Sequence, residues 1–110
     1  MTGNGIDEVL AAFCDPTRRR LLEALSVRGR ATATALAAEL PISRQAVVQH
    51  LAVLESVGIV RGERVGREHL YELLPDRLAE TARWMAGLAA SWNTRLAAIK
   101  RIAEAVEPPT

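Results

Sequence analysis

The chain has 110 residues, of which 49% are hydrophobic and 25% charged, and its net charge at pH 7 is +1. This length suits a single domain, and this composition argues against a disordered chain. Aromatic residues make up only 4% of the sequence while alanine occurs 19 times, which favours a helical protein over a β-sandwich.

Cys14 is the only cysteine, so the chain cannot form an intramolecular disulfide or a cysteine-rich metal cage. Met1–Gly5 lacks the basic and apolar pattern of a secretory signal, and no apolar run approaches the roughly 20 residues that cross a bilayer. We therefore expect a soluble, cytoplasmic protein. Thirteen of the 14 basic residues are arginine, which suits bidentate contacts with phosphate or guanine, but genomic codon bias is the favoured explanation.

Helical signals dominate the first 40 residues. Apolar residues at helical spacing predict a short first helix: Ile6, Val9, Leu10 and Phe13. Asp15 and Pro16 then supply an N-cap and a first-turn proline for a second helix, which Gly29 ends. Thr32 is the expected cap of a third helix that stops at Pro41.

Ser43 is the expected cap of a fourth helix over 43–57, whose inward face carries Val47, Leu51 and Leu54. Gly58 follows where a left-handed C-terminal cap is expected. The period then changes, because Ile59–Val65 and Glu68–Leu73 are strand-like runs on either side of Gly66-Arg67.

A last helix begins at Pro75-Asp76, and nothing interrupts it before Pro108. The predicted order is four helices, a β-hairpin and a fifth helix, which is typical of a winged helix-turn-helix fold, mainly α with a small hairpin. We treat 1–110 as one domain, with a core of about 6–74 and a dimerisation helix of about 76–106.

The helix over 43–57 carries side chains that can read base edges in a major groove. Arginine can hold guanine, glutamine can hold adenine, and valine can contact a thymine methyl group. The candidate base-reading residues are Ser43, Arg44, Gln45, Val48 and Gln49. The alternative is an ordinary solvated helix face.

The hairpin over 59–73 is the candidate wing. It holds three arginines in seven residues, and these can lie along phosphates or enter a minor groove. The candidate backbone-contacting residues are Thr32, Thr34, His50, Arg61, Arg64 and Arg67. The alternative is a charged strand edge that discourages aggregation.

Five short segments together resemble ArsR/SmtB-type bacterial transcriptional regulators. They are Asp15–Leu22, Ser43–Glu55, Gly58–Val60, Val65–Arg67 and Tyr71–Leu73. The resemblance covers about residues 6–105 and implies a homodimer that binds pseudo-palindromic operator DNA and usually represses. It places His50 at the family's histidine before a leucine, and Arg64 and Arg67 on the wing. Many relatives carry Ser-Lys where this chain has Val48-Gln49.

The chain departs from the metal-sensing members of that family. It has no Cys-x-Cys pair over 40–45 and no histidine in the last helix. His50 and His69, the only histidines, are more typical of structural or DNA-facing residues than of ligands, because a metal site needs three or four converging groups. We predict no metal and no cofactor.

The last helix shows a continuous apolar seam. Positions spaced by seven are Leu78, Met85, Trp92, Ile99 and Val106, and Ala82, Ala89, Leu96 and Ala103 complete the pattern. Since the helix exceeds what this core needs, part of the seam is expected to pair with a second chain. The predicted interface residues are Ile6, Val9, Leu10, Leu78, Met85, Ala89, Trp92, Leu96 and Ile99. The alternative is packing within the monomer. Trp84, off the seam, is expected either to pack on the body or to line an effector pocket.

These patterns predict a DNA-binding transcriptional regulator acting as a dimeric repressor, with an unidentified small-molecule effector as a further candidate partner. The alternative is a winged-helix module for protein–protein contact without DNA binding. No phosphate-binding loop, catalytic triad or metal cluster is visible, so we do not expect an enzyme. Cys14 is expected to be either a small buried apolar residue or a redox-sensing thiol.

Overall fold

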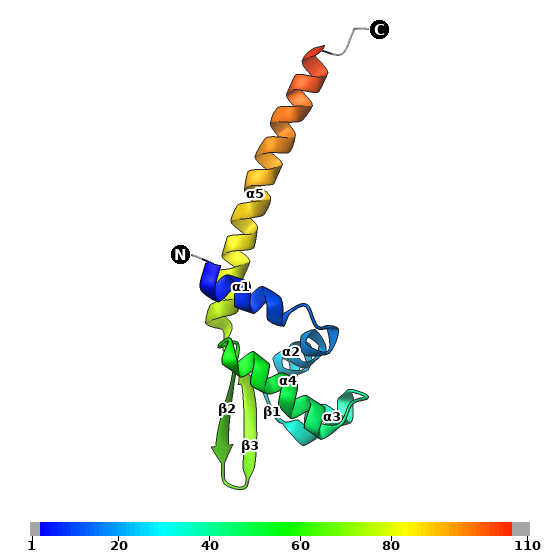
Figure 1. Ribbon diagram of the computed structural model, residues 1–110, viewed down its shortest axis with the longest axis vertical. Coiled ribbons are helices and arrows are strands. Elements are labelled where there is room, and N and C mark those ends of the chain that lie inside the picture. The colour runs from blue at the N-terminus through cyan, green and yellow to red at the C-terminus, as the bar shows by residue number, and fades with distance from the viewer. Residues whose placement is uncertain (1–2, 107–110) are drawn as a thin grey trace.

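The computed structural model describes residues 3–106, with five helices and three strands among them (Figure 1). In chain order these are α1 (Gly3–Ala12), α2 (Pro16–Arg28), β1 (Arg30–Thr32), α3 (Ala33–Glu39), α4 (Arg44–Ser56), β2 (Val60–Val65), β3 (Glu68–Leu73) and α5 (Pro75–Val106). The predicted winged helix-turn-helix class is confirmed.

Three helices start where capping side chains were expected. The Asp15 carboxylate accepts hydrogen bonds from the backbone N–H groups of Thr17 at 2.7 Å and Arg18 at 3.3 Å. The hydroxyls of Thr32 and Ser43 each accept one bond at 3.1 Å from a backbone N–H three residues later. Because these caps satisfy donors that the helix itself leaves free, they fix where α2, α3 and α4 begin.

The strands form an antiparallel sheet in the order β1-β3-β2. β2 and β3 follow the predicted hairpin, with Val65 opposite Glu68, and Gly66 turns the chain at a φ of 63°. β1 was not predicted: its three residues lie between Gly29 and the α3 cap and carry no strand pattern of their own. Pairing with β3, some forty residues later, makes this segment a strand.

The core lies between the helices and one face of the sheet. Its largest fully buried side chains are Val9, Leu21, Leu25, Leu36, Val47, Leu51, Leu54 and Ile59. The inward face predicted for α4 is therefore confirmed. Val9, in contrast, was predicted to face a second chain, and that prediction is wrong because the side chain is 0% exposed in the monomer. Leu78 likewise packs against its own core.

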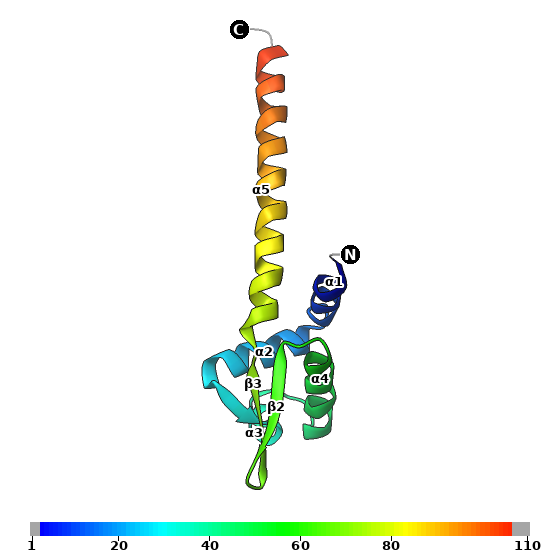
Figure 2. The same ribbon diagram turned by 90° about the vertical axis from the view of Figure 1, so that its left-hand side faces the viewer.

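Helix α5 projects from the body at the end opposite the tip of the β2–β3 hairpin (Figures 1 and 2). The molecule is consequently elongated, with extents of 73 × 32 × 19 Å. Helix α1 packs beside the first part of α5. In the part of the chain that the structure describes, no helix combines the length and the apolar character needed to cross a membrane.

An apolar stripe runs along the projecting part of α5, and nothing within residues 3–106 covers it. Its large side chains are about half exposed: Trp84, Met85, Leu88, Trp92, Leu96, Ile99 and Ile102. The predicted packing of Trp84 on the body is not found, because this ring is 44% exposed and belongs to the same stripe. The side chain of Val106, the last predicted seam position, lies outside the described residues.

Candidate nucleic-acid interface

The outward face of α4 is polar and open to solvent. Gln45 and Gln49 lie four residues apart on that face and are both exposed, as is Ser43 at the helix start. The Ser43 hydroxyl already accepts the Ala46 N–H, so its lone pairs are partly used by the cap. Val48 is half-buried and packs against the core, which leaves only part of its side chain for a contact outside the protein.

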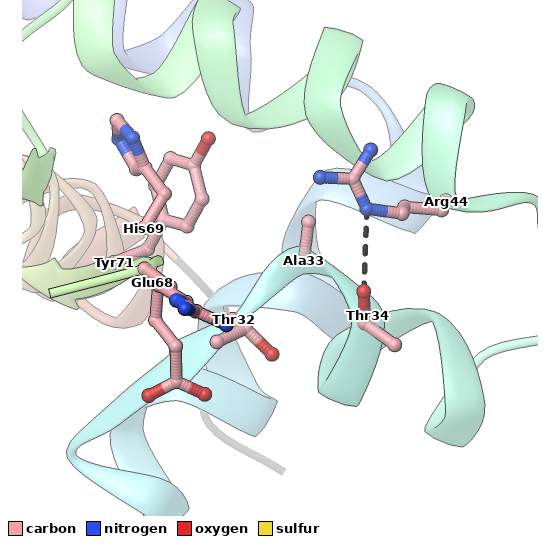
Figure 3. Close-up of a pocket in the computed structure, with 8 residues that line it drawn as sticks. Thr32, Ala33, Thr34, Arg44, Glu68, His69 and Tyr71 are labelled. Carbon is pink, nitrogen blue, oxygen red and sulfur yellow. Dashed lines mark hydrogen bonds between the residues drawn. The ribbon is translucent and has the colours of Figure 1, made fainter. Parts of the chain in front are cut away.

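Arg44 points into a groove between α4, the start of α3 and the wing (Figure 3). Its Nε donates a hydrogen bond of 3.2 Å to the Thr34 hydroxyl, and its charge partly offsets the increase that burial causes in the pKa of Tyr71. The groove has a volume of about 370 Å³ and is lined by Thr32, Ala33, Thr34, Arg44, Arg67, Glu68, His69 and Tyr71. The Arg44 guanidinium thus lies in this groove beside the start of α3, to which it is hydrogen-bonded.

The two faces of the wing differ in chemistry, because side chains alternate along each strand. Arg64 lies opposite His69 and falls on the same face as the buried Tyr71, which is the face covered by the helices. Arg61 lies opposite Glu72 on the other face, and its guanidinium contacts the Glu72 carboxylate at 2.6 Å. The structure therefore does not bring Arg61 together with α4.

Ion pairing on the outer face explains the pKa directions there. The hydrogen bond from Arg61 holds the pKa of Glu72 below its ordinary value, and the same bond raises the pKa of Arg61. Arg30 pairs with Glu63 at 2.9 Å across the same sheet face. These pairs join β1, β2 and β3, and they neutralise the outer face of the wing.

Three arginines, one on α4 and two on the wing, have no carboxylate partner in the part of the chain that the structure describes. Four ion pairs occur among residues 3–106, and none of them includes Arg44, Arg64 or Arg67. All three side chains are exposed. Because an unpaired guanidinium is free to bind an anion bidentately, this side of the molecule is suited to phosphate.

Two other predicted positions lie away from this groove. His50 is half-buried and acts electrostatically on Asp15 at the start of α2. The net effect on Asp15 is a lowered pKa. Burial alone would raise this pKa, but the hydrogen bonds from the Thr17 and Arg18 N–H groups and the electrostatic effects of His50 and Arg18 outweigh burial. Cys14 is exposed, so the expectation of a buried apolar cysteine is wrong. Its Sγ lies 3.5 Å from the Leu10 carbonyl oxygen.

A contact between α4 and the wing was not predicted. The Glu55 carboxylate, near the end of α4, accepts the backbone N–H of Gly62 in β2 at 3.1 Å. The His69 ring lies against Gly62, with its centroid 4.8 Å from that of Tyr71. Burial raises the pKa of Tyr71, and nearby Glu55 adds to the increase. A glycine at the centre of a predicted strand was the one sequence signal for such a close approach.

The predicted dimer residues fall into two groups. Met85, Ala89, Trp92, Leu96 and Ile99 are exposed along α5, whereas Ile6 and Leu10 on α1 are half-buried. No group of three histidine, cysteine, aspartate or glutamate side chains converges within the described residues.

Comparison with known proteins identifies the same architecture. A family model described as a helix-turn-helix domain matches residues 13–63. A solved ArsR-like transcriptional regulator from Rhodococcus sp. RHA1 is 43% identical, with a TM-score of 0.79, and the match covers 93% of this chain and 95% of that one.

Curated relatives agree with this match. The HTH-type transcriptional regulator Rv2034 of Mycobacterium tuberculosis is 40% identical over 73 residues, covering 66% of this chain and 67% of the relative. The transcriptional repressor SdpR of Bacillus subtilis is 31% identical over 80 residues, covering 73% of this chain and 88% of the relative. The chain therefore belongs to the ArsR/SmtB-type family of winged helix-turn-helix, DNA-binding transcriptional regulators.

Proposed function

We propose that the protein is a homodimeric repressor that binds a pseudo-palindromic operator, with α4 in the major groove and the wing on the flanking backbone or in the minor groove. The observation that carries this proposal is the distribution of charge around α4. Arg44, Arg64 and Arg67 have no carboxylate partner among residues 3–106, whereas Arg61 of the wing and Arg30 of β1, on the outer face of the sheet, are both paired.

Within this proposal the side chains divide into two roles. Gln45 and Gln49 read base edges, because both are exposed on the outward face of α4 and carry amides suited to adenine. Arg44 and Thr34 hold a phosphate, since their mutual hydrogen bond brings the guanidinium and the hydroxyl together in one groove. Arg64 and Arg67 neutralise phosphates on the wing side. This division moves Arg44 from base reading to backbone contact.

Dimerisation through α5 follows from its uncovered stripe. Seven large apolar side chains between Trp84 and Ile102 are 44–64% exposed. A contiguous apolar surface of this kind marks an interface, because exposing it to water is unfavourable. A second copy of α5 offers the same stripe, and a two-fold dimer would place the two α4 helices about one DNA turn, roughly 34 Å, apart.

Relatives support the repressing role. Two matched relatives are named as transcriptional repressors, and a dimer bound across a promoter excludes other proteins from that DNA. The location of the operator is not encoded in the fold, so the upstream region of the protein's own gene is the natural first target.

The proposal is tested by fluorescence anisotropy with a labelled fragment of that upstream region, at several salt concentrations, beside a scrambled fragment. We expect tight, salt-dependent binding that prefers the upstream fragment. If the protein does not prefer the upstream fragment over the scrambled one, a selection from genomic fragments follows. Failure of that selection to enrich any sequence would refute operator binding. The same assay then screens metals, oxidants and small molecules for an effector.

A further inference from the structure

We propose that Glu55 is a positioning residue for DNA binding: its carboxylate fixes the wing relative to α4 through the Gly62 N–H and thereby aligns Arg64 with the phosphates that flank the site read by α4. This inference rests on the proposed operator binding. It concerns residues that contact each other and not the DNA.

The contact joins the two DNA-facing elements at an otherwise open strand edge. β2 is one of the two edge strands of the sheet, since the strand order is β1-β3-β2, and the outward N–H groups of an edge strand lack a strand partner. The Gly62 N–H is met by Glu55 Oε2 at 3.1 Å. Glu55 belongs to the last turn of α4, so the bond connects the helix directly to the wing.

Gly62 is the residue that permits this approach. A Cβ built at this position would overlap His69 Nε2 and lie 3.0 Å from Glu55 Oε2. The backbone does not require glycine, because the described glycines with positive φ are Gly29, Gly58 and Gly66. The need for glycine at position 62 therefore comes from its neighbours, namely the carboxylate of α4 on one side and the His69 ring on the other.

Arg64 follows two residues after Gly62 on the same strand and face, opposite His69. Its Nε is 3.4 Å from the Gly66 carbonyl oxygen, which is a weak bond within the hairpin tip. Beyond Gly62 the described residues of β2 are all exposed. Among the described residues, the Glu55 bond is thus the last hydrogen bond between a helix and β2 before the exposed tip from which Arg64 extends.

Electrostatics alone and the positioning role predict opposite changes in DNA affinity when Glu55 is removed. An acid beside a phosphate-binding wing repels DNA, so by electrostatics Glu55→Ala would tighten binding. If Glu55 positions the wing, Glu55→Ala instead weakens operator binding roughly tenfold at physiological salt and lowers the salt slope by about two per dimer, equivalent to one phosphate contact per protomer. Glu55→Gln keeps an acceptor for the Gly62 N–H and should bind at least as tightly as the wild type.

The experiment measures anisotropy at several salt concentrations and hydroxyl-radical footprints for the wild type, Glu55→Ala, Glu55→Gln and a matched control, Glu23→Ala. Glu23 is an exposed glutamate on α2 that makes no side-chain hydrogen bond or ion pair within residues 3–106. We expect Glu55→Ala to lose protection at the flanks of the operator while the central protection by α4 remains. Circular dichroism checks that each variant is folded.

A second set of variants tests the same contact if Glu55→Ala does not fold, namely Gly62→Ala alone and Gly62→Ala combined with His69→Ala. Gly62→Ala should weaken binding by displacing His69 and Glu55, and adding His69→Ala should restore much of the affinity by making room for the new methyl group. Unchanged or tighter binding by Glu55→Ala with intact flanking protection would overturn the proposal, as would equal losses in Glu55→Ala and Glu55→Gln. Failure of the wild type to bind any operator would instead refute the proposed function.

Discussion

Arg64 offers the most direct test of how the wing contributes to binding. Its side chain is exposed, lies on the helix-covered face of the sheet and has no carboxylate partner among residues 3–106. Arg61, three residues earlier, carries the same charge but pairs with Glu72 at 2.6 Å on the opposite face. The pair of substitutions Arg64→Ala and Arg61→Ala therefore removes one charge each from the same strand, in two different environments.

The expected magnitude follows from counterion release. Each neutralised phosphate contributes about 0.9 to the slope of log K against log salt, so a dimer that loses Arg64 from both wings loses about 1.8. Between about 50 and about 200 mM salt, a slope change of that size corresponds to roughly a 12-fold difference in affinity. Wild-type affinity should fall about 12-fold more over this range than that of Arg64→Ala, while Arg61→Ala should keep the wild-type slope.

The assay is anisotropy with one operator fragment and one scrambled fragment at four or more salt concentrations. Arg64→Ala should weaken both fragments alike, since phosphate contacts carry no sequence information. An unchanged slope for Arg64→Ala, or the same slope change for Arg61→Ala, would refute the assignment of the wing faces. If Arg64→Ala weakened binding to the operator fragment but not to the scrambled fragment, the phosphate role would be refuted and base reading indicated.

Four further predictions concern other parts of the molecule. Gln45→Ala should cost about 1–3 kcal/mol of discrimination at one base position, measured by competition among operator variants, and an equal loss on scrambled DNA would contradict base reading. Leu96→Glu, on the α5 stripe, should give a monomer by light scattering, whereas Ala97→Glu, on the other side of the helix, should remain dimeric; a dimer in both would argue against the α5 interface. Pairing with Arg61 depresses the pKa of Glu72. The pair therefore stabilises the fold at pH values above the ordinary carboxyl pKa, and this contribution is lost as the pH falls through the lowered pKa. Acid should consequently lower the Tm of the wild type more than the Tm of Glu72→Gln. Any effect of a thiol-specific oxidant on DNA binding should vanish in Cys14→Ser, because Cys14 is the chain's only thiol, and a response that persists would exclude it as the sensor.

Local chemistry made much of the fold readable from the sequence. Asp15, Thr32 and Ser43 cap three helices, because a short polar side chain placed before a helical run satisfies backbone donors wherever that helix lies. The spacing of Val47, Leu51 and Leu54 identified the buried face of α4, since a helix in a small domain must bury one side. The hairpin turn at Gly66 followed from the backbone conformation that glycine favours.

The tertiary structure decided those features that depend on contacts between residues distant in the chain. β1 exists because β3 pairs with it, and Val9 is buried in its own monomer, although its spacing fits an interface equally well. The three wing arginines are equivalent in the sequence, yet strand register places Arg61 against Glu72 and leaves Arg64 without a carboxylate partner among the described residues. Periodicity shows that a side chain shares a face with its neighbours, but the partner of that face is set by how elements far apart in the sequence pack together.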